Sequence, residues 1–103
     1  MTRVRIDPGI CGFPAIVEIK TVGKRQYSVK ITTECEKLTL LSKQIGILDL
    51  KEAFKQAKDS TLYSDVADCL LHPACPAPMG IIKALEVEAG IALARDVVIR
   101  FDT

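Results

Sequence analysis

The stretch that decides the fold covers residues 13–33 and reads FPAIVEIKTVGKRQYSVKITT. In each half, apolar residues occupy every second position: Ala15, Val17 and Ile19, then Tyr27, Val29 and Ile31. This alternation predicts two strands with one buried face each, because successive side chains of a strand point to opposite sides. The polar GKRQ segment between the halves is typical of a hairpin turn. We therefore expect an antiparallel sheet near the start of the chain.

The flanking segments predict one more strand before this hairpin and a helix after it. Val4 and Ile6 lie next to arginines and indicate an earlier strand. Residues 33–45, TECEKLTLLSKQI, change to helical spacing. The apolar residues that share one side of this helix are Leu38, Leu41 and Ile45. Thr33 with Glu36 three residues later forms a capping box, which predicts that the helix begins there.

Three more helices and a closing strand are expected in the second half. Helical patterns cover residues 49–57, 62–71 and 79–90, and DVVIRF at 96–101 has strand composition. The residues expected on the buried sides of the last two helices are Leu62, Val66, Cys69, Leu70, Ile82, Leu85 and Ala89. The expected order is β-β-β-α-α-α-α-β. Strands before helices predict an α+β fold, a single domain over residues 1–103 with helices on one face of a small antiparallel sheet.

Composition narrows the classes of function. The chain has 103 residues and a formal net charge of +1, with lysine and arginine dispersed instead of clustered. This excludes a polybasic nucleic-acid stripe, so we expect neither nucleic acid nor membrane as a partner. The N-terminus has no apolar core of a signal peptide, which favours a cytoplasmic protein with reduced thiols. Four cysteines in that setting are ligands, nucleophiles or core residues more often than disulfides.

The segment CLLHPACPAPMG, residues 69–80, carries two of these cysteines and the only histidine. Prolines after Cys75 predict that it stands at the N-terminus of the last helix, where a thiolate is stabilised. His72 is expected to end the third helix, and Asp68 one turn earlier is expected to hold the second ring nitrogen of His72 and so to orient the imidazole toward a metal. Cys69 belongs to an apolar stripe, so it is interpreted as a core residue and only secondarily as a ligand.

Two further cysteines complete the candidate set. Cys11 lies in the glycine- and proline-rich loop DPGICGFP before a predicted strand, and Cys35 falls in the first turn of the first helix. Each could equally be a plain loop or helix residue. Together with His72 and Cys75 they form a set of sulfur and nitrogen ligands suited to zinc or an iron–sulfur cluster. We expect the three cysteines to converge at one end of the sheet, with His72 near.

Two resemblances accompany these motifs. The tail HPACPAPMGIIKALEVEAGIALARDVVI, residues 72–99, resembles a small family of uncharacterised proteins from anaerobic bacteria and methanogenic archaea. The order of parts is similar, more distantly, to the U-type iron–sulfur cluster scaffolds (the IscU/NifU N-terminal type). Those proteins carry CG before a strand, a cysteine at the start of the following helix, and a late cysteine beside a histidine. In this chain these positions match Cys11, Cys35 and the pair His72 and Cys75.

The scaffold resemblance implies a cofactor site with Cys11, Cys35, His72 and Cys75 as ligands. It covers residues from about 7 to 90, and four details differ from the scaffold pattern. Phe13 stands where the scaffolds have an aspartate, two residues are inserted between His72 and Cys75, and the chaperone-recognition motif LPPVK is missing. The closing strand is also extra to the pattern.

Three functions compete for this site. The leading hypothesis is an iron–sulfur cluster or metal-binding scaffold or carrier, whose partners would be sulfur donors or acceptor apo-proteins. A structural zinc module is the second, and a thiol redox or sulfur-transfer protein is the third, with Cys75 or Cys35 as nucleophile and His72 as base. No oxyanion-hole or substrate motif accompanies the Cys–His pair, so a non-enzymatic role is favoured. A homodimer is compatible with all three.

Overall fold

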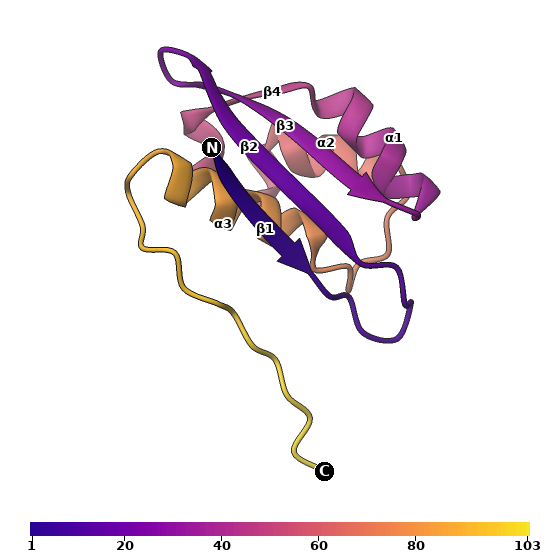
Figure 1. The fold of residues 1–103 in the computed structure, drawn as a ribbon. Helices are drawn as coiled ribbons and strands as arrows, with labels where there is room; N and C mark the ends of the chain where they lie inside the picture. The colour runs from indigo at the N-terminus through magenta and orange to yellow at the C-terminus, as the bar shows by residue number, and fades with distance from the viewer.

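The computed structural model describes all residues, 1–103, and builds a four-stranded sheet with three α-helices (Figure 1). The strands and α-helices are β1 (Thr2–Ile6), β2 (Ala15–Gly23), β3 (Gln26–Thr33), α1 (Glu36–Ile45), β4 (Ile47–Asp49), α2 (Thr61–Asp68) and α3 (Ala77–Glu88). Two short 3₁₀ turns, η1 (Leu50–Ala53) and η2 (Ala57–Asp59), connect β4 to α2. The chain is therefore α+β.

The sheet is an antiparallel meander in the order β1-β2-β3-β4. Val17 pairs with Val4 on one side and with Ile31 on the other, so these three side chains share a face. The helices pack on that face, as the alternation in residues 13–33 predicts (Figure 1). On the opposite face, Arg3, Glu18 and Lys30 lie in one cross-strand row and meet solvent.

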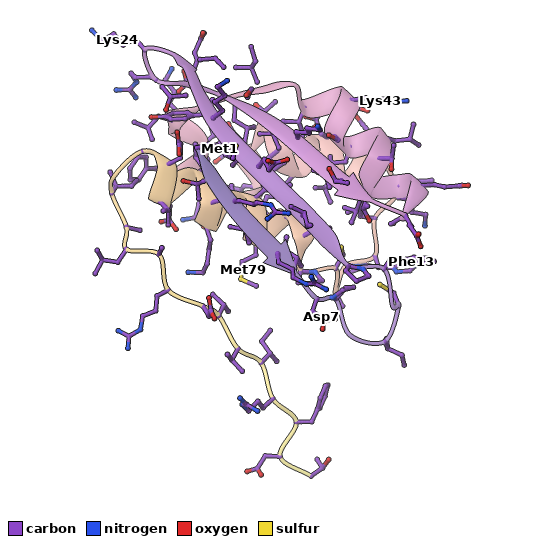
Figure 2. The ribbon with its side chains drawn as sticks, viewed as in Figure 1. Met1, Asp7, Phe13, Lys24, Lys43 and Met79 are labelled. Atoms are coloured by element: carbon purple, nitrogen blue, oxygen red, sulfur yellow. The ribbon has the colours of Figure 1, made fainter.

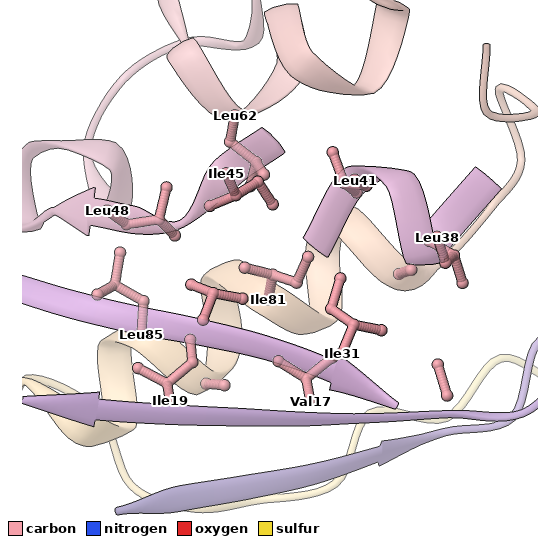
Figure 3. Packing of buried hydrophobic residues seen from close by; sticks show 14 of the residues in the cluster. Val17, Ile19, Ile31, Leu38, Leu41, Ile45, Leu48, Leu62, Ile81 and Leu85 are labelled. Carbon is pink, nitrogen blue, oxygen red and sulfur yellow. The ribbon is translucent and has the colours of Figure 1, made fainter. Parts of the chain in front are cut away.

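One hydrophobic core lies between the sheet and the helices (Figure 3). Its fully buried large side chains come from every layer: Ile19, Leu41, Leu62, Ile81, Leu85 and Val17. Leu38, Leu41 and Ile45 of α1 are buried together, as the helical spacing predicts. In α3 the buried face is Ala77, Pro78, Ile81, Ala84 and Leu85, whereas Ile82 and Ala89 are only partly buried. The prediction is therefore confirmed for Leu85, but Ile81 and Ala84 are buried in place of Ile82 and Ala89.

The segment predicted as a helix at residues 49–57 is not one. Residues 47–49 form β4, which pairs with residues 26–28 of β3, and a 3₁₀ turn follows. Asp49 does cap this turn by accepting from the Lys51 N–H at 2.8 Å. Glu52, however, points into the protein and is 4% exposed. It accepts hydrogen bonds from Ser60 Oγ and from the N–H of Leu62. Glu52 therefore provides an acceptor for a backbone N–H group in the first turn of α2.

Two other helix limits differ from the expectation. Helix α1 begins at Glu36, and its N-cap is Cys35 instead of Thr33. Helix α2 ends at Asp68, because Leu70 adopts a left-handed φ of 57° that stops the helix. This turn leaves Leu70 73% exposed, whereas its stripe predicted burial. Cys69 is buried in the core, as that stripe predicts.

The expected closing strand does not form. Residues 91–103 follow α3 as an extended segment without secondary structure and leave the body of the molecule (Figure 1). The observed order therefore departs from β-β-β-α-α-α-α-β in three ways: β4 is added, the helix at 49–57 is lost, and the last strand is unpaired. No helix of the structure is both long and apolar enough to cross a membrane.

Candidate functional site

Three segments that carry cysteines meet at one end of the sheet. Ile6 at the end of β1 pairs with Ala15 at the start of β2, and Ala15 pairs with Thr33 at the end of β3. The loop between β1 and β2 and the start of α1 therefore lie side by side. The backbone of Gly80 in α3 packs against the Ile6 side chain, which brings the start of α3 to the same end. Figure 2 shows Asp7 and Phe13 there, on either side of the β1–β2 loop.

Cys35 is held by the connection between β3 and α1. Its N–H donates to Thr33 Oγ1 at 3.1 Å, and that hydroxyl donates to the Pro14 carbonyl at 3.0 Å. This chain of hydrogen bonds ties the start of α1 to the residue before β2. The Cys35 side chain is half-buried and packs against the core. As the N-cap residue, it stands at the positive end of the helix dipole.

Cys75 lies immediately before α3. The Cys75 N–H donates to the His72 carbonyl at 3.0 Å, which closes a tight turn, and Pro76 and Pro78 stiffen the first turn of the helix. Burial raises the pKa of the Cys75 thiol most strongly, the N–H of Ala77 lowers it, and negative charge on Cys11 and Cys35 raises it further. The pKa of Cys75 is therefore raised on balance, although this residue stands at a helix N-terminus.

Cys11 approaches from the loop between β1 and β2, and its side chain is exposed. The loop turns through Gly9 and Gly12, which both adopt left-handed backbone angles, and the Gly12 N–H donates to the Gly9 carbonyl. Cys11 and Cys35 each contribute to the raised pKa of Cys75, so each of the two lies within electrostatic range of the Cys75 thiol. The structure thus places the segments that carry Cys11, Cys35 and Cys75 at the same end of the sheet, although these side chains do not converge on one point.

His72 and Asp68 are placed differently from the expectation. Because α2 ends at Asp68, His72 lies beyond the helix in the turn before Cys75, with its side chain exposed. The Asp68 carboxylate accepts from Gln44 Nε2 at 3.1 Å, as Asp65 does at 2.9 Å. Asp68 is thus bound to α1 in this structure.

Cys69 lies apart from the three clustered thiols. It is 8% exposed, and its Sγ donates to Gln44 Oε1 at 3.6 Å. Burial raises the pKa of Cys69, and the nearby carboxylates of Asp65 and Asp68 raise it further. Its surroundings are those of a protonated core thiol.

The donor set fits a soft metal by its chemistry, because thiolates and imidazole are the ligands that zinc and iron–sulfur clusters take. As the side chains stand, no group of three or more His, Cys, Asp or Glu residues converges closely enough to hold an ion. The exposed Cys11 loop and the exposed His72 are the two parts that would have to approach Cys35 and Cys75.

Sequence reasoning missed an apolar pocket beside Cys75. The turn that holds His72 and Cys75 forms one wall, and Tyr63 of α2 and Met79 of α3 form others. Ile99 of the C-terminal segment reaches its rim. Tyr63 and Met79 lie in predicted helices and are partly exposed, at 36% and 38%. Large, mainly apolar side chains that remain exposed indicate the wall of a pocket. This exposure can be recognised only in the tertiary structure, so the sequence alone does not reveal the pocket.

The comparisons with known proteins give a family and no activity. A family model described as "Family of unknown function (DUF6951)" matches residues 2–101. No curated protein and no solved structure matches the chain.

Proposed function

The chain belongs to the DUF6951 family of unknown function, and we propose from its own site that it binds a soft metal ion or an iron–sulfur cluster. Cys11, Cys35 and Cys75 would be the thiolate ligands, and His72 would supply the fourth. In this proposal the protein acts as a metal-binding or cluster-binding scaffold or carrier. Sulfur donors and acceptor apo-proteins would be its partners.

The observation that carries the proposal is that the three segments bearing Cys11, Cys35 and Cys75 meet at one end of the sheet. Three thiols from three distant parts of the chain lie near enough for charge on two of them to raise the pKa of the third. Three neighbouring thiolates repel one another, and a bound cation removes that repulsion. Because thiols must lose their protons to bind a metal, a raised pKa makes affinity depend on pH.

The surroundings of the three cysteines differ: Cys35 and Cys75 are held in place by packing, whereas Cys11 lies in an exposed loop. Cys35 and Cys75 are half-buried, hydrogen-bonded at their backbones and packed against the core. Cys11 is exposed, and a β-carbon added at Gly9 or Gly12 would meet nothing within 4 Å. The loop is thus free of packing that would resist closure over an ion. The similarity of these positions to the U-type scaffolds points to the same ligand set.

The test is metal analysis of protein purified without oxygen, then reconstituted with iron and sulfide or with zinc. We expect stoichiometric binding by the wild type, and loss of binding in Cys75→Ala, Cys35→Ala and Cys11→Ala. Cys69→Ala is the matched control and should retain the metal. Visible absorption of brown protein indicates a cluster, and colourless protein with zinc indicates the structural zinc module. Absence of any metal in wild type after both reconstitutions would remove the proposal.

A second candidate is thiol–disulfide exchange, because exposed Cys11 lies near half-buried Cys75. Here the Cys11 thiolate would attack a partner's disulfide and release one partner thiol. Cys75 or Cys35 would then attack the mixed disulfide, leaving an internal disulfide and a fully reduced partner. This activity predicts that metal-free protein treated with a disulfide loses the mass of two hydrogen atoms. In Cys11→Ala no such loss should occur.

A further inference from the structure

The C-terminal segment, residues 91–103, is extended and apolar, and little of it is covered. Its large side chains are the most exposed group of hydrophobic residues in the chain, with Leu93 at 89%, Ile99 at 77% and Phe101 at 94%. Ile99 contacts the pocket beside Cys75, but most of the Ile99 side chain remains exposed to solvent. An exposed row of this kind marks a surface that another chain covers.

The backbone of the segment is also unpaired. The Ile91 N–H donates to the Glu86 carbonyl, and no backbone–backbone hydrogen bond involves residues 92–103. Residues 96–101, DVVIRF, have the β-branched and aromatic composition of a strand. The exposed N–H and C=O groups of such a segment bond to water and remain available for pairing with the edge of a sheet.

A matching ladder exists at β1. This strand is the edge of the sheet and pairs only with β2, so its other side presents unused hydrogen-bonding groups. At about 3.3 Å per residue, residues 96–101 span roughly the length of the five-residue β1. At the other edge, β4 is three residues long and too short for such a segment.

We propose that the C-terminal segment of one copy adds as a strand to β1 of a second copy, and that the exchange of two such arms makes a symmetric dimer. Each copy supplies one arm and one edge, so the two contacts are identical and the assembly closes. This inference is independent of the metal site.

The side chains of the two strands match in polarity. Thr2, Val4 and Ile6 face the core, whereas Arg3 and Arg5 are exposed on the outer face. If Val97, Ile99 and Phe101 continue the core side, the alternation places Asp96, Val98, Arg100 and Asp102 on the outer side. Asp96 and Asp102 then lie on the face that carries Arg3 and Arg5, with Arg100 between them, so two acidic side chains and one basic side chain meet the two arginines. Opposite charges on adjacent strands favour this pairing.

The path of the segment favours the second copy over its own β1. Glu88, near the end of α3, accepts from Thr2 Oγ1 at 2.7 Å, so the segment leaves α3 beside the start of β1. From there it diverges from its own β1 (Figure 1), and its Ile99 lies at the pocket beside Cys75. A chain that begins next to its own edge and extends away from it is arranged to reach another molecule.

The first experiment measures the mass in solution of the full chain by sedimentation or light scattering at several concentrations, with two adjacent proline variants. In an added edge strand, alternate N–H groups point to the partner and to solvent. One of Val97→Pro and Val98→Pro should therefore raise the dimer dissociation constant at least about tenfold, because its N–H bonds the partner, while the other changes it little. If both prolines change the dissociation constant equally, the copies associate through apolar contacts without backbone hydrogen bonds between strands, and the proposal is wrong.

The second experiment identifies β1 as the acceptor. The double variants Arg3→Glu/Arg5→Glu and Asp96→Lys/Asp102→Lys should each dimerise more weakly than wild type, because like charges then face each other. An equimolar mixture of the two should recover dimers, since each mixed contact again joins opposite charges. A wild-type monomer at every concentration, or a mixture no more dimeric than its components, would overturn the proposal.

Discussion

Gly80 of α3 lies directly against the side chain of Ile6 in β1. A β-carbon at position 80 would be 2.9 Å from Ile6 Cγ1 and closer still to Cδ1, so the Ile6 side chain or one of the two elements would have to shift. This contact sets how near the start of α3 comes to the end of β1. Since Cys75 lies just before α3 and Cys11 lies in the loop after β1, the same contact positions two of the three clustered thiols.

We predict that Gly80→Ala destabilises the protein by about 1–3 kcal/mol, the usual effect of overpacking a core. This packing cost exceeds the gain in helix propensity, because alanine in a helix interior is otherwise about 0.5–1 kcal/mol more stable than glycine. Denaturant unfolding of each variant measures the free energy. In an Ile6→Val background, which removes the crowding Cδ1, the cost of Gly80→Ala should fall. Strict additivity of the two substitutions would show that the contact does not limit the packing.

Glu52 gives the protein a stability that depends on pH. Burial alone would raise the pKa of Glu52, but hydrogen bonds from Lys55, the Leu62 N–H and Ser60 together hold it below the ordinary value of 4.5. Lys55 Nζ lies 2.7 Å from the carboxylate. A carboxyl with a lowered folded-state pKa contributes stability that is fully present above its unfolded-state pKa, and that is lost as the pH falls through its folded-state pKa.

Glu52→Gln should therefore cost about 1–3 kcal/mol at neutral pH, because buried donors lose a charged acceptor. The difference between wild type and variant should shrink below a pH of about 4.5. Thermal melting from pH 7 down to 3 measures this. Glu36→Gln, at an exposed position in α1, is the matched control. A constant difference across the whole range would contradict the role assigned to the ionised carboxylate.

The sequence predicts the sheet well because its alternation is local. Residues 15–33 carry both the strand pattern and the turn, so pairing and burial follow from neighbours. It fails at Glu52, whose spacing from Asp49 suggests a helix start. The residue instead satisfies the N–H of Leu62, ten positions further on, and no periodicity encodes that long-range contact.

The site shows the same division between local and long-range signals. The settings of Cys35 and Cys75 at helix starts follow from Thr33 and the prolines nearby. The position of His72 does not, because the left-handed turn at Leu70 ends α2 earlier than its apolar stripe indicates. The nearness of Cys11 to Cys75 depends on the Ile6–Gly80 contact, which joins segments far apart in the chain and leaves no local trace.

Alkylation of metal-free protein should distinguish the four thiols by rate. Cys11 is exposed and should react first. Cys75 and Cys69 should react slowly at neutral pH, because burial raises the pKa of both and the thiolate is the reactive form. Mass spectrometry of peptides after timed treatment gives each rate. Addition of the metal should protect Cys11, Cys35 and Cys75 and leave the rate at Cys69 unchanged; protection of Cys69 alone would place the metal elsewhere.

Cys69 provides a final prediction, because its polar partner is fixed by other residues. Gln44 Nε2 donates to the carboxylates of Asp65 and Asp68, which orients its Oε1 toward the Cys69 thiol. From the apolar stripe alone, a serine hydroxyl at position 69 would be expected to lack a partner and to cost more than alanine. The structure supplies that partner.

We therefore expect Cys69→Ala to lose roughly 1 kcal/mol, the scale of a small cavity, and Cys69→Ser to lose no more than that. In a Gln44→Met background the order should reverse, because methionine keeps the side-chain length but offers no comparable acceptor for the buried hydroxyl. Chemical unfolding of the four variants and the two parents measures the coupling. If serine is worse than alanine with Gln44 present, the amide does not accept from position 69, and the burial of the thiol alone explains its place in the core.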